Sequence, residues 1–127
     1  MKIVGAIARY LLGLMFLVFG SNMFLQFLNM PLPSGLAGQF MAALVAAHYF
    51  YVVGAIMVIS AILLLANRYV GLGLTLLGPV LFNILVFHIL MQPGGIGPGA
   101  FATLLWFLVA WQHRSVFARL FAARLEE

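Results

Sequence analysis

The stretch LLLANRYVGLGLTLLGPVLFNILVFHILM, from Leu63 to Met91, decides the fold that this sequence predicts. Two apolar runs flank Asn67 and Arg68, and a short polar break between such runs is typical of a turn. The second run, which starts at Tyr69, has the roughly 20 apolar residues that a helix needs to cross a bilayer core of about 30 Å. We therefore expect an antiparallel pair of membrane-crossing helices that are joined at Asn67 and Arg68.

The composition extends this expectation to the whole chain. Of 127 residues, 66% are hydrophobic and only 6% are charged, and the mean hydropathy is +1.21. An apolar fraction this high leaves an apolar outer surface as well as an apolar core, which indicates contact with the lipid bilayer. The length allows about four crossings. The net charge of +4 forms no basic stripe on a soluble fold, so we expect no nucleic-acid partner.

We predict an all-α, integral membrane four-helix bundle that forms a single domain. Crossings are expected at about 3–28, 48–66, 69–91 and 96–112, with an outer loop at 29–47 and a tail at 113–127. A helix from 39 to 68 would be roughly 43 Å long, so a helical segment after the first loop should lie along the interface. The basic tail is imperfectly amphipathic, because Arg124 falls on its apolar side. It rests on the inner leaflet or continues the fourth helix into water.

The positive charges predict the orientation of the chain. They all lie near the two ends or in the second connection, at Lys2, Arg9, Arg68, Arg114, Arg119 and Arg124. Cytoplasmic loops carry an excess of Lys and Arg, so both termini are expected in the cytoplasm. Arg9 interrupts the first apolar run, and we expect its side chain to extend to the lipid headgroups.

Five polar side chains gather toward the other, outer end of the predicted bundle. His48 and His88 lie equally far from Arg68 along the chain, and Asn83 lies about 7–8 Å deeper than His88. Asn22 and Gln26 share one face of the first helix, because residues four apart are neighbours on a helix. Polar groups in hydrocarbon are costly unless they find hydrogen bonds, so these side chains should face the bundle interior or the interface.

Two interpretations of this polar set stay open. The residues can join the helices by hydrogen bonds, or they can line a small pocket for a quinone headgroup, a haem or another amphipathic ligand. No metal site is expected, because no carboxylate or thiolate accompanies the imidazoles. The only acidic residues are Glu126 and Glu127, so we expect no catalytic residues and no activity by this chain alone.

Small residues predict close helix packing. Gly5, Gly13 and Gly20 recur about every seven residues in the first helix, and such spacings allow two membrane helices to approach closely.

Three segments carry a resemblance to a known family. They are ARYLLGLMFLVFGSNMF (Ala8–Phe24), MPLPSGLAGQFMAAL (Met30–Leu44) and LLLANRYVGLGLTLLGPVLFNILVFHILMQPGG (Leu63–Gly95), which together cover about half of the chain. The last is the most specific, with its Asn-Arg-aromatic turn, its Pro and its Asn and His. Together they resemble the DoxX-like family of small four-helix bacterial membrane proteins. Relatives often carry an acidic residue in the second helix, and the region around Met57 has none.

The resemblance implies a location in the bacterial cytoplasmic (inner) membrane. It also implies a non-catalytic accessory or small subunit of a larger respiratory or quinone-linked assembly, with other membrane subunits or copies of itself as partners. The alternatives are a stand-alone binding or transport protein for a small neutral or amphipathic ligand, and a b-type haem carrier.

Overall fold

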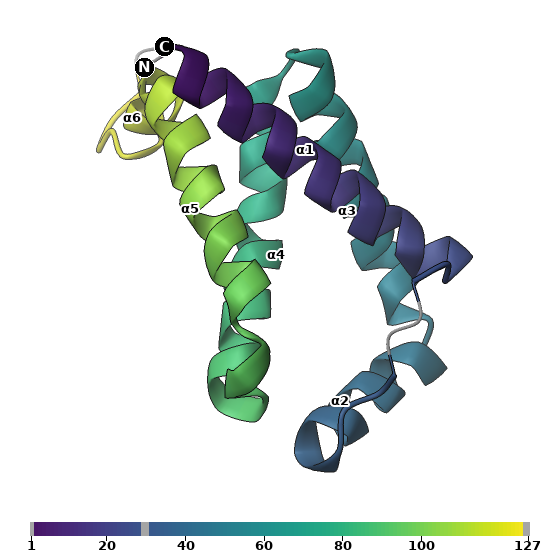
Figure 1. Cartoon of the computed structure of the whole chain (residues 1–127). Helices are drawn as coiled ribbons and strands as arrows, with labels where there is room; N and C mark the ends of the chain where they lie inside the picture. Colours follow the sequence, from purple (N-terminus) through teal and green to yellow (C-terminus); the bar gives the residue numbers. More distant parts are fainter. Residues whose placement is uncertain (1, 29–30, 126–127) are drawn as a thin grey trace.

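The computed structural model describes residues 2–28 and 31–125, and in them the chain is helical and forms no strand (Figure 1). The elements are α1 (Lys2–Leu25), α2 (Gly35–Ala46), α3 (Tyr49–Ala66), α4 (Val70–Met91), the short 3-10 helix η1 (Pro93–Gly95), α5 (Gly97–Gln112) and α6 (Arg114–Leu120). The all-helical prediction is confirmed. Residues 29–30 of the predicted outer loop and both glutamates, Glu126 and Glu127, lie outside the described residues.

Two residues in the left-handed conformation set the ends of α3. Asn67 has a φ of 54° just after α3, and its N–H donates to the Leu64 carbonyl at 3.2 Å. Asn adopts this conformation more readily than most residues, which suits it to end a helix. At the other end, His48 has a φ of 57° and separates α2 from α3. The apolar segment that was too long for one crossing is therefore two helices.

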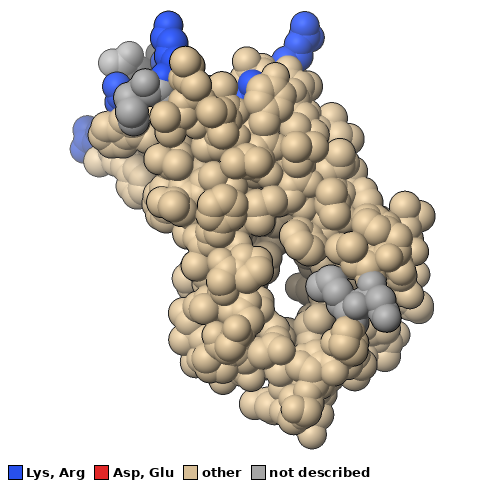
Figure 2. Space-filling view, in the orientation of Figure 1, with Lys and Arg blue, Asp and Glu red and all other residues tan. Residues whose placement is uncertain are grey.

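Three helices, α1, α3 and α4, are long and apolar enough to cross a membrane. The 16 residues of α5 give a length of about 24 Å, less than a bilayer core of about 30 Å. Nevertheless α5 returns the chain to the end from which it starts. Figure 1 shows both termini and the α3–α4 turn at one end of the molecule, and α2 and η1 at the other. All Lys and Arg side chains that Figure 2 shows lie at the first end, which we call the basic end.

The hydrophobic core lies toward the basic end. On α1 the last buried residue is Gly20, and on α4 it is Leu81, so the last ten residues of α4 contribute no buried side chain. Beyond this point α4 and α5 stay together but diverge from α1 and α3 (Figure 1), and Figure 2 shows an opening through the molecule there. In residues 2–28 and 31–125, α2 is the element that reaches across this opening to α4, where the ring centroids of Phe40 and Phe87 are 5.7 Å apart. We call this half of the bundle the open end.

Glycines allow α1 and α3 to pack closely. A Cβ atom added to Gly54 of α3 would lie 2.7 Å from the Met23 Cβ and 3.0 Å from the Gly20 carbonyl oxygen. On α1, a Cβ added to Gly13 would lie 2.8 Å from the side chain of Leu65. The close approach predicted from the spacing of Gly13 and Gly20 is thereby confirmed.

We expect Gly54→Ala to lower the free energy of unfolding by about 1–3 kcal/mol, the usual cost of overpacking. The added methyl group meets backbone on α1, which cannot move aside as a flexible side chain can. Gly97→Ala is the matched control, because nothing lies within 4 Å of a Cβ there, and it should change stability by less than about 0.5 kcal/mol. Unfolding in mild detergent measures both, and equal effects would contradict the packing described.

Candidate functional site

The two amides predicted on α1 lie where that helix ends. The Asn22 side chain accepts a hydrogen bond from the Leu28 N–H at 2.8 Å. Gln26 follows α1 in the left-handed conformation with a φ of 51°, and its side chain is exposed. Asn22 therefore ties the chain just beyond α1, at Leu28, back to the last turn of the helix.

The three predicted residues on or beside α3 and α4 also make local contacts. Asn83 donates from its amide to the Pro79 carbonyl at 2.8 Å, and His88 Nδ1 lies 2.8 Å from the Ile84 carbonyl oxygen. His48 is exposed and stacks on Tyr51 with ring centroids 5.5 Å apart.

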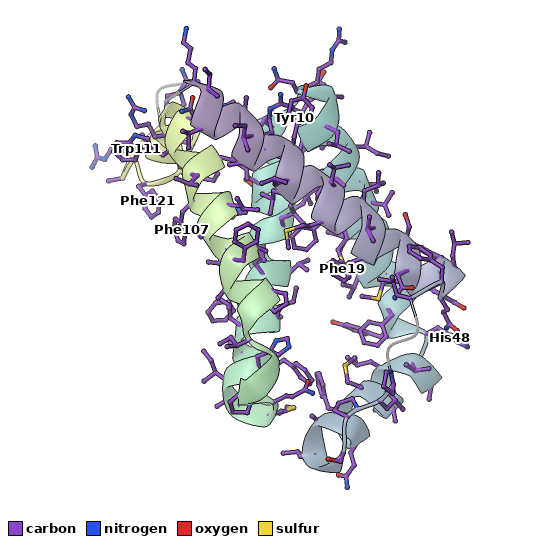
Figure 3. The ribbon with its side chains drawn as sticks, in the orientation of Figure 1. Tyr10, Phe19, His48, Phe107, Trp111 and Phe121 are labelled. Atoms are coloured by element: carbon purple, nitrogen blue, oxygen red, sulfur yellow. The ribbon has the colours of Figure 1, made fainter. Side chains whose placement is uncertain are left out.

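These three residues lie toward the open end, and Figure 3 shows His48 there. In the described part of the chain, no hydrogen bond or ring contact joins His48, Asn83 or His88 to one another. The polar pocket formed by the five residues stays a prediction. Among residues 2–28 and 31–125, no group of three or more His, Cys, Asp or Glu residues could hold a metal ion.

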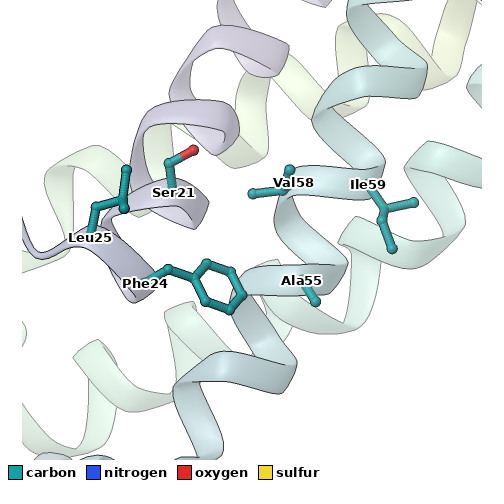
Figure 4. Close-up of a pocket in the computed structure, with 6 residues that line it drawn as sticks. All are labelled: Ser21, Phe24, Leu25, Ala55, Val58 and Ile59. Atoms are coloured by element: carbon teal, nitrogen blue, oxygen red, sulfur yellow. The ribbon is translucent and has the colours of Figure 1, made fainter.

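A pocket of about 370 Å³ lies between α1 and α3 near the open end (Figure 4). Ser21, Phe24 and Leu25 line it from α1, and Ala55, Val58 and Ile59 line it from α3. The Ser21 hydroxyl is the only polar side-chain group among these six residues. The pocket therefore suits an apolar chain and offers little to orient a polar ligand.

A second pocket, of about 270 Å³, lies at the basic end and has a very different lining. We call it the basic pocket. Its polar side chains are contributed by α1, the α3–α4 turn and the end of α5: Lys2, Arg9, Asn67, Gln112 and His113. It brings together two permanent cations and two side-chain amides, and no described carboxylate lines it.

Arg9 is buried beside this pocket, with 8% of its surface exposed. Its side chain was expected to extend outward to the headgroups, but it packs against α3 instead. Its guanidinium donates from Nη1 to the Leu64 carbonyl, in the last turn of α3. The carboxyl end of a helix carries partial negative charge, so it compensates part of the cost of burying the cation. The guanidinium carbon also lies 4.4 Å from the ring centroid of Tyr10.

The pKa of His113 reflects its position in the basic pocket. It lies between α5 and α6, outside the three helices long enough to cross a membrane. Burial lowers the pKa of His113 below its ordinary value of 6.5, and the charge of Arg9 lowers it further. The basic pocket therefore disfavours additional positive charge.

Sequence reasoning missed the basic pocket because its residues are far apart in the chain. A signal was present, because Arg9 stands in an apolar run and no acidic residue precedes Glu126. A buried Arg9 without a carboxylate must find backbone carbonyls or an external anion. The residues that complete the pocket, such as Asn67 and His113, come together only through the packing of α1 between α3 and α5.

We compared the chain with family models, with curated proteins and with solved structures, and none matched. Membership of the DoxX-like family is therefore a proposal that depends on the segments quoted above.

The lowered pKa of His113 predicts how stability depends on pH. Below 6.5 the unfolded chain binds a proton at His113 that the folded chain resists, so stability is full above this pH and falls as the pH drops through the folded pKa. Unfolding temperatures measured between about pH 8 and pH 5 should fall for the wild type and fall less for His113→Gln. An identical pH dependence in the two proteins would contradict the burial of His113 beside Arg9.

Proposed function

We propose that this chain is a DoxX-like, multi-pass protein of the bacterial cytoplasmic membrane. In this proposal it serves as a small non-catalytic subunit of a larger membrane assembly that is respiratory or quinone-linked. The membrane assignment is supported by three long apolar helices and by the many large apolar side chains exposed along them. The redox character of the assembly comes from the family resemblance alone.

The arrangement of the termini supports four crossings with both termini in the cytoplasm. If α1, α3 and α4 each cross the membrane, α5 must cross back, because the chain starts and ends at the basic end (Figure 1). The short length of α5 is then compensated by η1 and Ile96, which extend the chain beyond its first turn. Lys2, Arg68 and Arg119 all fall on the side that the positive-inside rule assigns to the cytoplasm.

The open end is the single observation that carries the subunit role. Protein interiors are close-packed, yet here the α4–α5 pair diverges from the α1–α3 pair and leaves an opening that α2 crosses. In a membrane such a space is filled by lipid, by a ligand or by part of another protein. A helix of a partner subunit would bury more of α4 beyond Leu81, where the side chains are only partly buried or exposed.

Mild extraction tests this role directly. The tagged protein is drawn from native membranes at its natural expression level, and the intact mass and composition of what it brings with it are measured. Larger redox subunits in the same particle are the expected result. Recovery alone, or only with copies of itself, would contradict a subunit role.

A ligand-binding function is the second candidate, because the same opening could hold an amphipathic molecule such as a quinone or, less favourably, a haem. Asn83 and His88 stand on the stretch of α4 that borders it. If the chain holds the ligand itself, Asn83→Ala and His88→Ala should reduce the quinone or haem that co-purifies and leave the unfolding temperature nearly unchanged. Lower stability with unchanged ligand content would show that these side chains serve only the structure.

A further inference from the structure

The basic pocket has the composition of an anion site. Lys2 contributes a flexible ammonium group, and Asn67 contributes a side-chain amide from the α3–α4 turn. Arg9 is more than nine-tenths buried and has a guanidinium with five N–H donors, of which Nη1 binds the Leu64 carbonyl. The guanidinium carbon also lies 4.4 Å from the centroid of the Tyr10 ring. The lining thus retains donors and positive charge for a ligand.

We infer that the basic pocket binds a phosphate group, carried either by a phospholipid headgroup or by a free anion. The planar donor fork of Arg matches phosphate oxygens, and Lys adds a mobile point charge. The volume of about 270 Å³ suits a headgroup better than a large cofactor. The pocket also lies at the basic end, where a membrane-embedded chain meets the headgroups.

The lowered pKa of His113 agrees with this inference. Burial and the charge of Arg9 make His113 resist a further proton when nothing negative occupies the pocket. A bound phosphate would add negative charge beside His113 and favour the protonated form of this residue. The inference does not depend on the proposed function, because a subunit and a stand-alone protein could equally hold a headgroup at this end.

The experiment measures the unfolding temperature of the purified full chain in a neutral detergent. One arm adds inorganic phosphate at constant ionic strength, with chloride as the balancing anion. Another adds phosphatidylglycerol, with diacylglycerol as the control that has similar acyl chains and no phosphate. Both arms are repeated with Glu126→Gln and Glu127→Gln together, since these are the only carboxylic side chains that could compete from within the chain.

Three variants test the site. Arg9→Met should weaken binding by about tenfold or more, because it removes hydrogen bonds to a charged group. Lys2→Met changes an exposed side chain of the pocket, so it tests binding even if Arg9→Met fails to fold. Arg68→Met is the matched control, since it removes the same charge from the same end but does not line the pocket.

Stabilisation by phosphatidylglycerol alone would identify a lipid headgroup, and stabilisation by inorganic phosphate alone would identify a free anion. Stabilisation by both would show a phosphate site open to either source. Each of these results supports the inference, provided that Lys2→Met weakens the effect and Arg68→Met does not. The inference would be overturned if neither phosphate nor phosphatidylglycerol stabilised the wild type or the double glutamate variant. It would also be overturned if Lys2→Met and Arg68→Met reduced the stabilisation equally.

Discussion

Where α1 crosses α3, Gly20 and Gly54 carry no side chains, and the two backbones come close enough that a single added methyl group would collide. Close contact of this kind drives helix association in lipid, where apolar burial gives no advantage. The crossing also sets where the other residues of α1 lie relative to α3. Arg9 stands about three turns before Gly20, and the same crossing brings its guanidinium against the last carbonyls of α3. The basic pocket is thus a consequence of how two glycine-lined helices pack.

The two ends of the molecule therefore differ in kind. At the basic end the helices are tightly packed, and the Trp106 indole donates to the Leu74 carbonyl at 2.9 Å, which ties α5 to α4. At the open end the α4–α5 pair diverges from the α1–α3 pair, and α2 reaches α4 through the Phe40–Phe87 ring contact. A closely packed end with several hydrogen-bond donors suits a small charged group, whereas an end with an apolar opening suits a chain, a ring or another helix. The two proposals therefore concern opposite ends of the molecule and can be tested separately.

Much of the fold could be predicted from local sequence. Asn67 and Arg68 mark a turn, residues 93–99 are rich in Gly and Pro, and the excess length before Arg68 requires a break, which falls at His48.

Side-chain partners were harder to predict, because they depend on which helix faces meet. Arg9 was expected at the headgroups, since a cation near a helix end usually extends outward, but its position on α1 turns it toward α3. The predicted polar residues Asn83 and His88 were correctly placed along α4, yet each contacts a carbonyl of its own helix, which spacing alone cannot reveal.

The proposed function requires that the basic end and the open end face opposite sides of a membrane. The chain contains no cysteine, so one introduced cysteine is a unique label. Gly94→Cys and Ser34→Cys probe the open end, and Arg68→Cys and Ser115→Cys probe the basic end, all at exposed positions. A membrane-impermeant maleimide added to intact bacterial spheroplasts should label the first pair, and it should label the second pair only after permeabilisation. Labelling of Gly94→Cys and Arg68→Cys from the same side would contradict the four-crossing bundle and its orientation.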